Sequence, residues 1–425
     1  MKITNIKAYQ IYDSRGYPTI ACKITLDQKN IGLSMVPSGA STGEKEACEL
    51  RDNNLDWKGK GVTKAIDNIN NIIAKRILNI EINNQKEIDD LLIQLDGTKN
   101  KNKLGANAIL AVSLAFCYAC SKASNYPLFK YISKNIYGTN SDKFYFPQPM
   151  INVLNGGKHA NNGFDFQEIM LVPISKNSIE ETLKIGDECF LELQNILKNK
   201  NYSIAKGDEG GFSIQFQNYY EPFELIIEAI KNCNYKPGVD VCIAIDVAAS
   251  EFYNGNTYNL HNENKISSLT SDQLIVLYCD LVEKYPIISI EDPFDENDWD
   301  SFVKLNNLIG NKIQIVGDDL YCTNKELLKK GIDKNATNAI LIKLNQIGTL
   351  SECLETIKLA QENNLKTIIS HRSGETEDTF IADLSVATSA MQIKTGSFSR
   401  SERLAKYNRL LEIDATIEKL NKPFF

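Results

Sequence analysis

The stretch Val241–Asp246, which reads VCIAID, is a continuous apolar run that ends at a carboxylate. Runs that are apolar throughout are typical of strands buried on both faces of a parallel sheet. The pattern recurs along the second half of the chain, where each run stops at a charged or polar residue. These runs are Pro286–Ile290 before Glu291, Ile313–Gly317 before Asp318, Ala339–Ile342 before Lys343, Lys366–Ser370 before His371 and Arg372, and Gln392–Ile393 before Lys394.

The segments between these runs have the periodicity of helices. Thr270-x-x-Gln273 is a capping box, and Leu350, Leu354 and Ile357 recur at helical spacing. Repeated strand–helix units with functional residue types at the strand ends predict a (β/α)8 barrel, in which the active site lies at that end. A doubly wound sheet is the alternative, but no Gly-x-Gly-x-x-Gly follows a strand here.

The first third of the chain has a different pattern. Apolar residues alternate with polar ones around Ile20–Leu26, which is the period of a half-buried strand, and helical patterns follow to about Lys134. Gly138–Asp142 has the composition of a connector. We therefore predict an N-terminal α+β domain over residues 1–137, with an antiparallel sheet plus helices, followed by a barrel domain over residues 138–425.

Composition narrows the class of protein. Hydrophobic residues make up 43% and charged residues 24% of the 425 residues, which is typical of a soluble globular protein. The net charge of -7 gives no general attraction for nucleic acid. We find no signal core at Met1 and no apolar run long enough to span a membrane, so we expect a cytoplasmic protein with reduced cysteines.

Three of the strand ends carry carboxylates. Asp246, Glu291 and Asp318 would converge in a barrel, where three like charges repel unless a positive charge lies among them. Ligands that are all oxygen select a hard cation, and Mg²⁺ suits a site that leaves coordination positions for a substrate. A solvated loop charge is the alternative for any one of these acids taken alone.

Cationic residues end the neighbouring runs. A lysine near a metal and another cation has its neutral form favoured, so Lys343 or Lys394 could act as a general base. Removing a proton next to a carboxylate forms an enolate, which metal ions stabilise. Arg372 suits bidentate contact with a phosphate, although a surface salt bridge would explain this arginine equally well.

Two loops add polar groups. Pro37–Gly43 is small and carries hydroxyls, and we interpret it either as a lid or as a plain turn. Gly207–Gly211 places Glu209 on a turn flanked by glycines, which allows close approach to a ligand.

Together these segments closely resemble the enolase family, in order and spacing, from Asp13–Gly16 to Lys394–Ser397. The resemblance implies an N-terminal α+β domain, a barrel with two antiparallel strands at its start, and Mg²⁺-dependent dehydration of 2-phosphoglycerate to phosphoenolpyruvate. It also implies two Mg²⁺ ions per site and a homo-oligomer, most often a dimer. The motifs that carry the resemblance are Ser38–Gly43, Leu104–Ala115, Asn155–Ala160, Gln167-Glu168, Gly207–Gly211, Ser289–Pro293, Gly317–Leu320, Lys343–Gly348 and Ser370–Asp378.

The resemblance further implies a role for each residue. Lys343 would be the base at C2, and Glu209, helped by Glu168, the acid that assists loss of the C3 hydroxyl. The metal ligands would be Asp246, Glu291 and Asp318 for the first Mg²⁺ and Ser41 for the second. The substrate contacts would be His159, Gln167, Glu168, Arg372, Ser373 and Lys394.

Two other functions remain open at this point. One is a relative that abstracts a proton next to the carboxylate of a different acid. The other is an enolase-like protein that is catalytically impaired and serves as a surface or structural binding protein.

Overall fold

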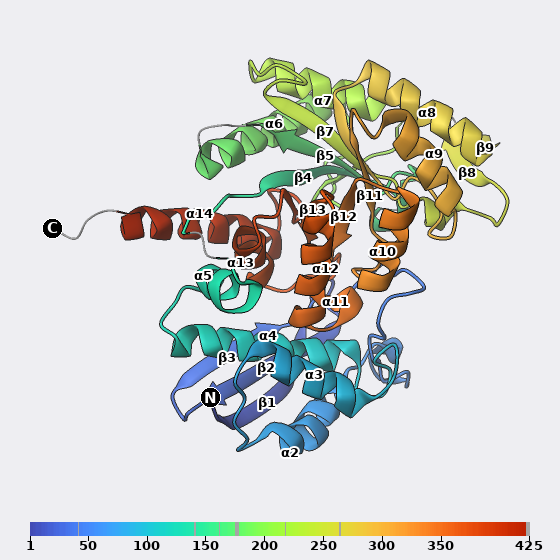
Figure 1. Cartoon of the computed structure of the whole chain (residues 1–425). Coiled ribbons are helices and arrows are strands. Elements are labelled where there is room, and N and C mark those ends of the chain that lie inside the picture. Colours follow the sequence, from blue (N-terminus) through green and yellow to red (C-terminus); the bar gives the residue numbers. More distant parts are fainter. Residues whose placement is uncertain are drawn as a thin grey trace.

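The structure is a computed structural model that describes residues 1–40, 42–139, 142–160, 162–174, 178–216, 218–262 and 265–421. Ser41, one of the predicted metal ligands, lies outside these residues. The chain forms a smaller N-terminal part and a barrel, which lie against each other (Figure 1).

The N-terminal part is built on an antiparallel sheet of three strands in the order β1 (Ile3–Tyr12), β2 (Pro18–Leu26) and β3 (Asn30–Met35). The alternating residues Ile20, Cys22, Ile24 and Leu26 lie on β2 and are buried, as the sequence predicts. The apolar helix α4 (Ala106–Ala123) packs on β2 and β3 (Figure 1).

Short helices surround this sheet. Helix α3 (Gln85–Asp96) begins at Asn84, whose side chain accepts a hydrogen bond from Glu87 N, and ends at Gly97, whose φ of 69° favours glycine. The other helical segments of this part are η1 (Asp56–Gly59), α1 (Thr63–Asp67), η2 (Asn68–Ile73), α2 (Ala74–Ile77), α5 (Leu128–Tyr131) and η3 (Ile132–Tyr137).

The barrel closes because β14 pairs with β4, and its eight strands confirm the predicted fold class. Strand β5 runs antiparallel to both of its neighbours, β4 and β7, whereas the other neighbouring pairs in the ring are parallel. The strands are β4 (Gln148–Asn155), β5 (Glu168–Pro173), β7 (Val241–Asp246), β10 (Ile287–Glu291), β11 (Gln314–Gly317), β12 (Ala339–Ile342), β13 (Lys366–Ser370) and β14 (Gln392–Lys394).

Helices cover the outside of the ring (Figure 1). The predicted capping box is present, because Thr270 and Gln273 exchange hydrogen bonds at the start of α8 (Ser271–Lys284). The other helices are α6 (Ile179–Asn199), α7 (Glu221–Asn232), α9 (Trp299–Ile309), α10 (Lys325–Lys334), α11 (Leu344–Ile347), α12 (Leu350–Glu362), α13 (Phe380–Ala387) and α14 (Ser401–Asn421). Short elements are β6 (Phe212–Ser213), η4 (Gly157–His159), η5 (Ala249–Phe252) and the hairpin strands β8 (Tyr258–Asn262) and β9 (Lys265–Leu269).

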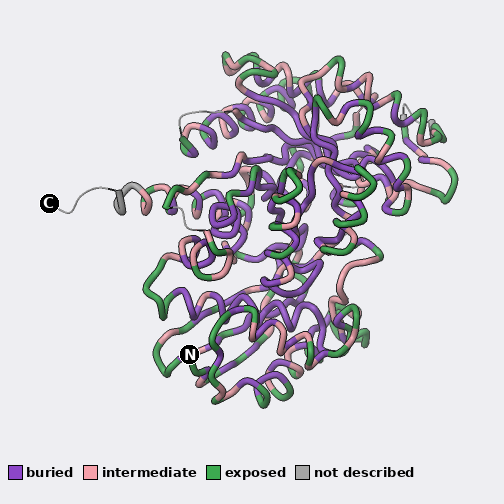
Figure 2. The backbone as a smooth tube through the Cα atoms, in the orientation of Figure 1, coloured by how far each residue is buried: buried purple, intermediate pink, exposed green. Residues whose placement is uncertain are grey.

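The inside of the barrel is a packed core. Figure 2 shows the strands buried along almost their whole length. We call the apolar residues that fill it the interior cluster: Met150, Met170, Val172, Cys242, Ala244, Val316, Ala339, Leu341 and Ile368.

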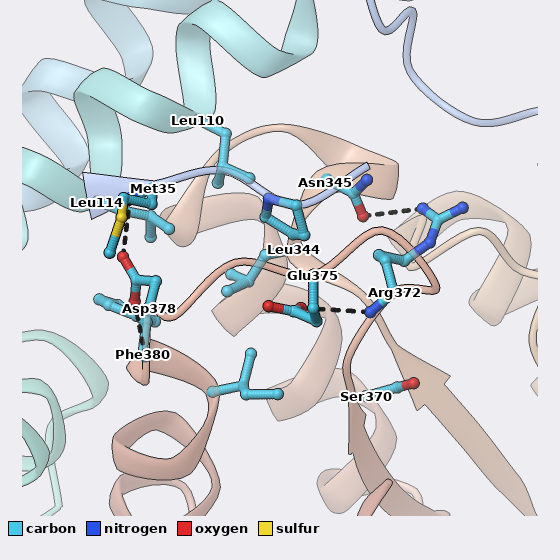
Figure 3. Close-up of a pocket in the computed structure, with 12 residues that line it drawn as sticks. Met35, Leu110, Leu114, Leu344, Asn345, Ser370, Arg372, Glu375, Asp378 and Phe380 are labelled. Atoms are coloured by element: carbon cyan, nitrogen blue, oxygen red, sulfur yellow. Dashed lines mark hydrogen bonds between the residues drawn. The ribbon is translucent and has the colours of Figure 1, made fainter. Parts of the chain in front are cut away.

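The N-terminal part contacts the loop that follows β13. Ser38 and Gly374 form a β-bridge, and Asp378 accepts hydrogen bonds from Met35 N and Tyr118 Oη at 2.9 and 2.7 Å. Figure 3 shows the small apolar pocket at this contact, between α4, α11 and α13. The N-terminal part therefore lies over the end of the barrel where β13 stops. The division of the chain at residues 137 and 138 stays a prediction.

Helix α4 is the one helix of the described residues that is long and apolar enough to cross a membrane, with a mean hydropathy of 1.4. We found no apolar run of this length in the sequence, whereas the structure shows a helix that is long enough. However, 83% of it is buried inside the protein, where it packs between the sheet and the barrel.

Candidate active site

The reversed direction of β5 explains why predicted residues from different parts of the chain meet. The parallel strands end at the mouth of the barrel with Asp246, Glu291 and Lys394, whereas β5 begins there with Glu168. In the pairing of β5 with β7, Glu168 lies opposite Asp246. A buried pocket at this mouth brings together nine of the predicted residues: His159, Gln167, Glu168, Glu209, Asp246, Lys343, Arg372, Ser373 and Lys394. Ser370 and His371 also line it.

Lys394 joins the carboxylates at the centre of the site. Its Nζ lies 2.7 Å from Asp246, 2.9 Å from Glu291 and 3.2 Å from Glu168. Although burial disfavours the ammonium, these carboxylates outweigh it and raise the pKa of Lys394 well above its usual value. Lys394 is therefore a fixed positive charge in this structure.

Lys343 follows β12 and forms an ion pair with Asp318, which also accepts a hydrogen bond from Gln346 Nε2 at 2.8 Å. Burial and Arg372 favour neutral Lys343, but Asp318 outweighs them and raises the lysine pKa. The expectation of a neutral lysine assumed a metal ion nearby and stays a prediction, because without that charge Asp318 favours the ammonium. Lys343 can act as a base only after this ammonium has lost a proton.

The carboxylates at the mouth carry more negative charge than the two lysines balance. Burial and then Asp246 raise the pKa of Glu291 well above its usual value, which is the sign of a carboxylate that needs further positive charge. The donors of Asp246, Glu291 and Asp318 are all oxygen, so they fit a hard divalent cation. In this structure the lysine ammonium groups bind these same oxygens.

Two groups of side chains bring three ligating atoms within 4.8 Å of one another among the described residues, and the predicted trio of Asp246, Glu291 and Asp318 is not one of them. One is Asp292, Asp318 and Asp319, and the other is His159, Glu168 and Glu209. In the first group, Asp292 is already used by the backbone, because it accepts hydrogen bonds from Asp318 N and Asp319 N. The metal ligands proposed from the sequence stay a prediction.

Glu209 is held by its glycine-flanked loop, as the sequence suggests. Gly207 N donates to Gly211 O at 2.8 Å, and Gly210 has a φ of 91° with Ser399 Oγ 2.3 Å from where a Cβ would lie. The carboxylate accepts a hydrogen bond from Asn152 Nδ2 at 3.0 Å. Burial alone would raise the pKa of Glu209, but its surroundings, including the permanently charged Arg403, outweigh burial and lower it well below its usual value.

Glu168 and Glu209 form an acid pair around His159, whose Nδ1 lies 3.6 and 3.7 Å from their Oε1 atoms. Burial and then the nearby Glu209 raise the pKa of Glu168 well above its usual value. Burial also lowers the pKa of His159 and keeps this ring neutral. The two carboxyl groups therefore differ in proton affinity, and Glu168 holds a proton more strongly than Glu209.

The side chain of Arg372 is buried and hydrogen-bonded to other residues. Its two terminal nitrogens each lie 3.1 Å from one oxygen of Glu46, and Nη1 donates to Asn345 Oδ1 at 2.8 Å (Figure 3 shows the contact with Asn345). Ser373 Oγ accepts a hydrogen bond from Ala40 N at 2.8 Å, which ties the loop before Ser41 to the barrel mouth.

Sequence reasoning missed several neighbours of these residues. Glu46 and Asn345 bind Arg372, and Asn152 and His371 surround Glu209. Asn152 lies on β4 as the polar residue inside the run 149–154 and donates to Glu209, and a polar residue within such a run is a signal that the sequence offers. Glu46 lies in a loop where no sequence pattern marks it, so its contact with Arg372 could only be seen in the structure.

Fold and site together define a class: a barrel protein with an N-terminal α+β domain and a buried site of carboxylates and lysines at the ends of its strands. Comparison with known proteins agrees. Residues 3–132 match the family model described as "Enolase, N-terminal domain", and residues 143–422 match "Enolase, C-terminal TIM barrel domain".

Curated proteins of the same family are similar over nearly the full chain. The enolase of Mycoplasma genitalium is 53% identical, over 97% of this chain and 92% of the relative. The enolase of Mycoplasmoides gallisepticum is 52% identical, over 97% of this chain and 89% of the relative. The chain belongs to the enolase family, whose members are phosphopyruvate hydratases, a kind of lyase.

Proposed function

We propose that this chain is a glycolytic enzyme that catalyses the reversible, Mg²⁺-dependent dehydration of 2-phospho-D-glycerate to phosphoenolpyruvate. The observation that carries the proposal is the meeting of a buried lysine, Lys394, and a half-buried one, Lys343, with an acid pair in one pocket. The reaction needs both kinds of group, because a proton must leave C2 and a hydroxyl must leave C3. Membership of the enolase family supports the same reaction.

Lys343 is the proposed base. The C2–H bond breaks, the proton passes to Lys343 Nζ, and the electron pair moves toward the substrate carboxylate. Lys343 must first lose a proton to become a neutral amine, since an ammonium cannot accept one, and its ion pair with Asp318 opposes that loss. Bound Mg²⁺, held by Asp246, Glu291 and Asp318, would supply positive charge that stabilises the negative charge on the substrate carboxylate. Lys394 adds a second fixed positive charge nearby.

The acid pair is proposed to assist the second step. The C3–O bond breaks, the C2–C3 double bond forms, and the hydroxyl leaves as water after it receives a proton. We assign this assistance to Glu209 with help from Glu168. Glu168 supports this role because burial and the neighbouring Glu209 raise its pKa well above the usual value, so it can hold a proton beside Glu209.

The remaining pocket residues are proposed substrate contacts. His159 and Gln167 have buried polar atoms, namely Nδ1 and Oε1, for which the described residues offer no hydrogen-bond partner. A ligand would satisfy them, because buried polar groups are rarely left unpaired. Arg372 and Ser373 are proposed to bind the phosphate, and Lys394 the carboxylate. Ser41 is retained as the proposed ligand of the second Mg²⁺.

Two further proposals follow from the family and from charge. We propose a cytoplasmic homodimer, and with a net charge of -7 we expect no binding to nucleic acid.

A coupled assay for phosphoenolpyruvate tests the proposed reaction. The purified protein with 2-phospho-D-glycerate and Mg²⁺ should form product, and phosphoenolpyruvate with water should give the reverse reaction. A folded protein that forms no phosphoenolpyruvate under these conditions would favour the binding-protein alternative. Turnover of another hydroxy acid, with none of 2-phospho-D-glycerate, would favour a relative with a different substrate.

A further inference from the structure

Arg403 is a fully buried arginine at the start of α14, and it lines neither the pocket nor a surface. Its Nη1 lies 2.7 Å from His371 Nδ1 and donates to Arg372 O at 2.6 Å. Its Nη2 donates to Ser373 O at 2.6 Å, and to Asp208 O and Ser14 Oγ at 3.3 and 3.4 Å. One guanidinium therefore connects the loop after β13 with the loop that carries Glu209.

The contact with His371 has a chemical consequence. A guanidinium has only donors and cannot lose its proton in a protein, so the ring nitrogen that faces it must be an acceptor. His371 Nδ1 therefore carries no hydrogen. A neutral imidazole must then carry its hydrogen on Nε2, and Nε2 lies 3.3 Å from Glu209 Oε2, close to the carboxylate but without hydrogen-bond geometry in this structure.

The surroundings keep this ring neutral. The pKa of His371 is lowered to about 4, because burial and the guanidinium of Arg403 together outweigh Glu209 and Glu375, which act in the opposite direction. Lys406 holds Glu375 through an ion pair of 2.8 Å, so the effect of that acid is partly balanced.

We propose that Arg403 is a positioning residue that locks His371 in the tautomer with hydrogen on Nε2, and so directs an N–H group at Glu209. The N–H would fix the direction of the Glu209 carboxylate, whose other neighbours are Asn152 and His159. The positioning proposal depends on the proposed function in one respect, namely that Glu209 takes part in the reaction. The tautomer itself is a property of the protein without substrate.

The sequence contains a weak signal for this role. Arg403, Tyr407 and Leu410 are spaced as neighbours on one helix face, and all three are buried. An arginine on the buried face of a helix is unusual unless it is paired.

The chain is well suited to a direct test, because it has only three histidines, His159, His261 and His371. Protein labelled with ¹⁵N in histidine gives three imidazole patterns in long-range ¹H–¹⁵N spectra, and His371→Gln assigns the relevant one. We expect a bare Nδ1 and a protonated Nε2 in the parent down to about pH 4. A parent ring with hydrogen on Nδ1, or an imidazolium at neutral pH, would overturn the proposal without any variant.

Arg403→Gln sharpens the test. The variant should show mixed tautomers and a higher His371 pKa, because a nearby cation is gone. Its kcat should fall about 10- to 100-fold, the loss typical when the partner that orients a functional imidazole is removed. The KM should change less, because Arg403 does not line the pocket. A folded Arg403→Gln that keeps the single Nε2–H tautomer would show that Arg403 has no positioning role.

Arg400→Gln is the matched control. Arg400 braces the same loop, since its Nε and Nη2 donate to Gly207 O at 3.2 and 2.9 Å, but no hydrogen bond joins it to His371. This variant should keep the Nε2–H tautomer, and a change of tautomer here would assign the effect to the loop instead of to Arg403. If the parent has the expected tautomer but forms no phosphoenolpyruvate, the proposed function fails while the positioning role stands.

Discussion

The interior cluster and the mouth of the barrel differ in whether they contain charged side chains. The interior cluster is apolar, and the residues that form it are almost fully buried. The mouth is equally buried, yet there Glu168, Asp246 and Glu291 each lie within salt-bridge distance of Lys394. Along β13, the same strand passes from Ile368 in the cluster to Ser370 at the mouth within two residues.

This difference indicates that the interior cluster stabilises the fold, whereas the mouth is the region for chemistry. Apolar burial stabilises a fold in proportion to the area removed from water, whereas buried charges contribute little net stability because their desolvation offsets their attraction. The charged side chains at the mouth of the barrel are therefore explained by function, and the apolar side chains of the cluster are explained by packing. If so, changes at the mouth should alter activity, and changes in the cluster should alter stability.

The largest expected effect is the removal of the divalent metal. Protein treated with a chelator should lose turnover and recover it with Mg²⁺, because the carboxylates at the mouth then lack the positive charge that they need. Mg²⁺ should also raise the unfolding temperature, since a ligand that binds only the folded state stabilises it. NaCl at equal ionic strength is the control. Full turnover in metal-free buffer would show that the reaction does not need a divalent metal.

The next effect tests the opposite end. Ile368→Ala should lower the free energy of unfolding by about 2–5 kcal/mol, the usual result when a large side chain is removed from a packed core. Leu308, which is 53% exposed on α9, offers the control, because Leu308→Ala should change stability by about 0.5 kcal/mol or less. Both values come from urea unfolding. Equal effects of the two substitutions would contradict the description of the cluster as a packed core.

A smaller effect concerns a buried acid away from the mouth. Asp89 on α3 is held by neutral donors, from Gln85 Nε2 at 3.1 Å and from Ser351 N and Oγ at 2.9 and 2.6 Å. Burial outweighs these hydrogen bonds and raises its pKa from 3.8 to about 6.

The sign of the pH dependence follows from this shift. Between about pH 4 and 6 the folded state keeps a proton that the unfolded state has lost, so this contribution to stability falls as the pH rises. The full shift corresponds to about 3 kcal/mol. The difference in unfolding free energy between the parent and Asp89→Asn should therefore change by about this amount across that window. A difference that is constant with pH would show that Asp89 does not titrate there.

Much of the architecture could be predicted from the sequence, because buried parallel strands have a simple pattern. The runs before Glu291, Asp318 and Lys343 became β10, β11 and β12, and the capping box at Thr270 starts α8. Strand β5 is the exception in direction, and only the family resemblance indicated an antiparallel pair at the start of the barrel.

The partners of the site residues were harder to predict. The ion pair between Lys343 and Asp318 joins two strand ends whose relative position depends on the whole ring. The pairing of Arg372 with Glu46 joins residues from the two parts of the chain. Periodicity shows which side of a strand is buried, but it carries no information about which charges meet.

The most direct test of the account is the fate of the C2 hydrogen of 2-phospho-D-glycerate in D₂O, followed by NMR. Lys343→Ala should lose both C2 exchange and product formation, by about 10²–10⁴ in rate, because no base removes the proton. Glu209→Gln should lose product formation but keep measurable exchange, because the proton can still leave and return. Lys366→Ala, an exposed lysine at the start of β13 and so at the opposite end of the barrel, should behave like the parent. If Lys343→Ala exchanged the C2 hydrogen at the parent's rate, Lys343 would not be the base, and the account of the barrel mouth would be contradicted.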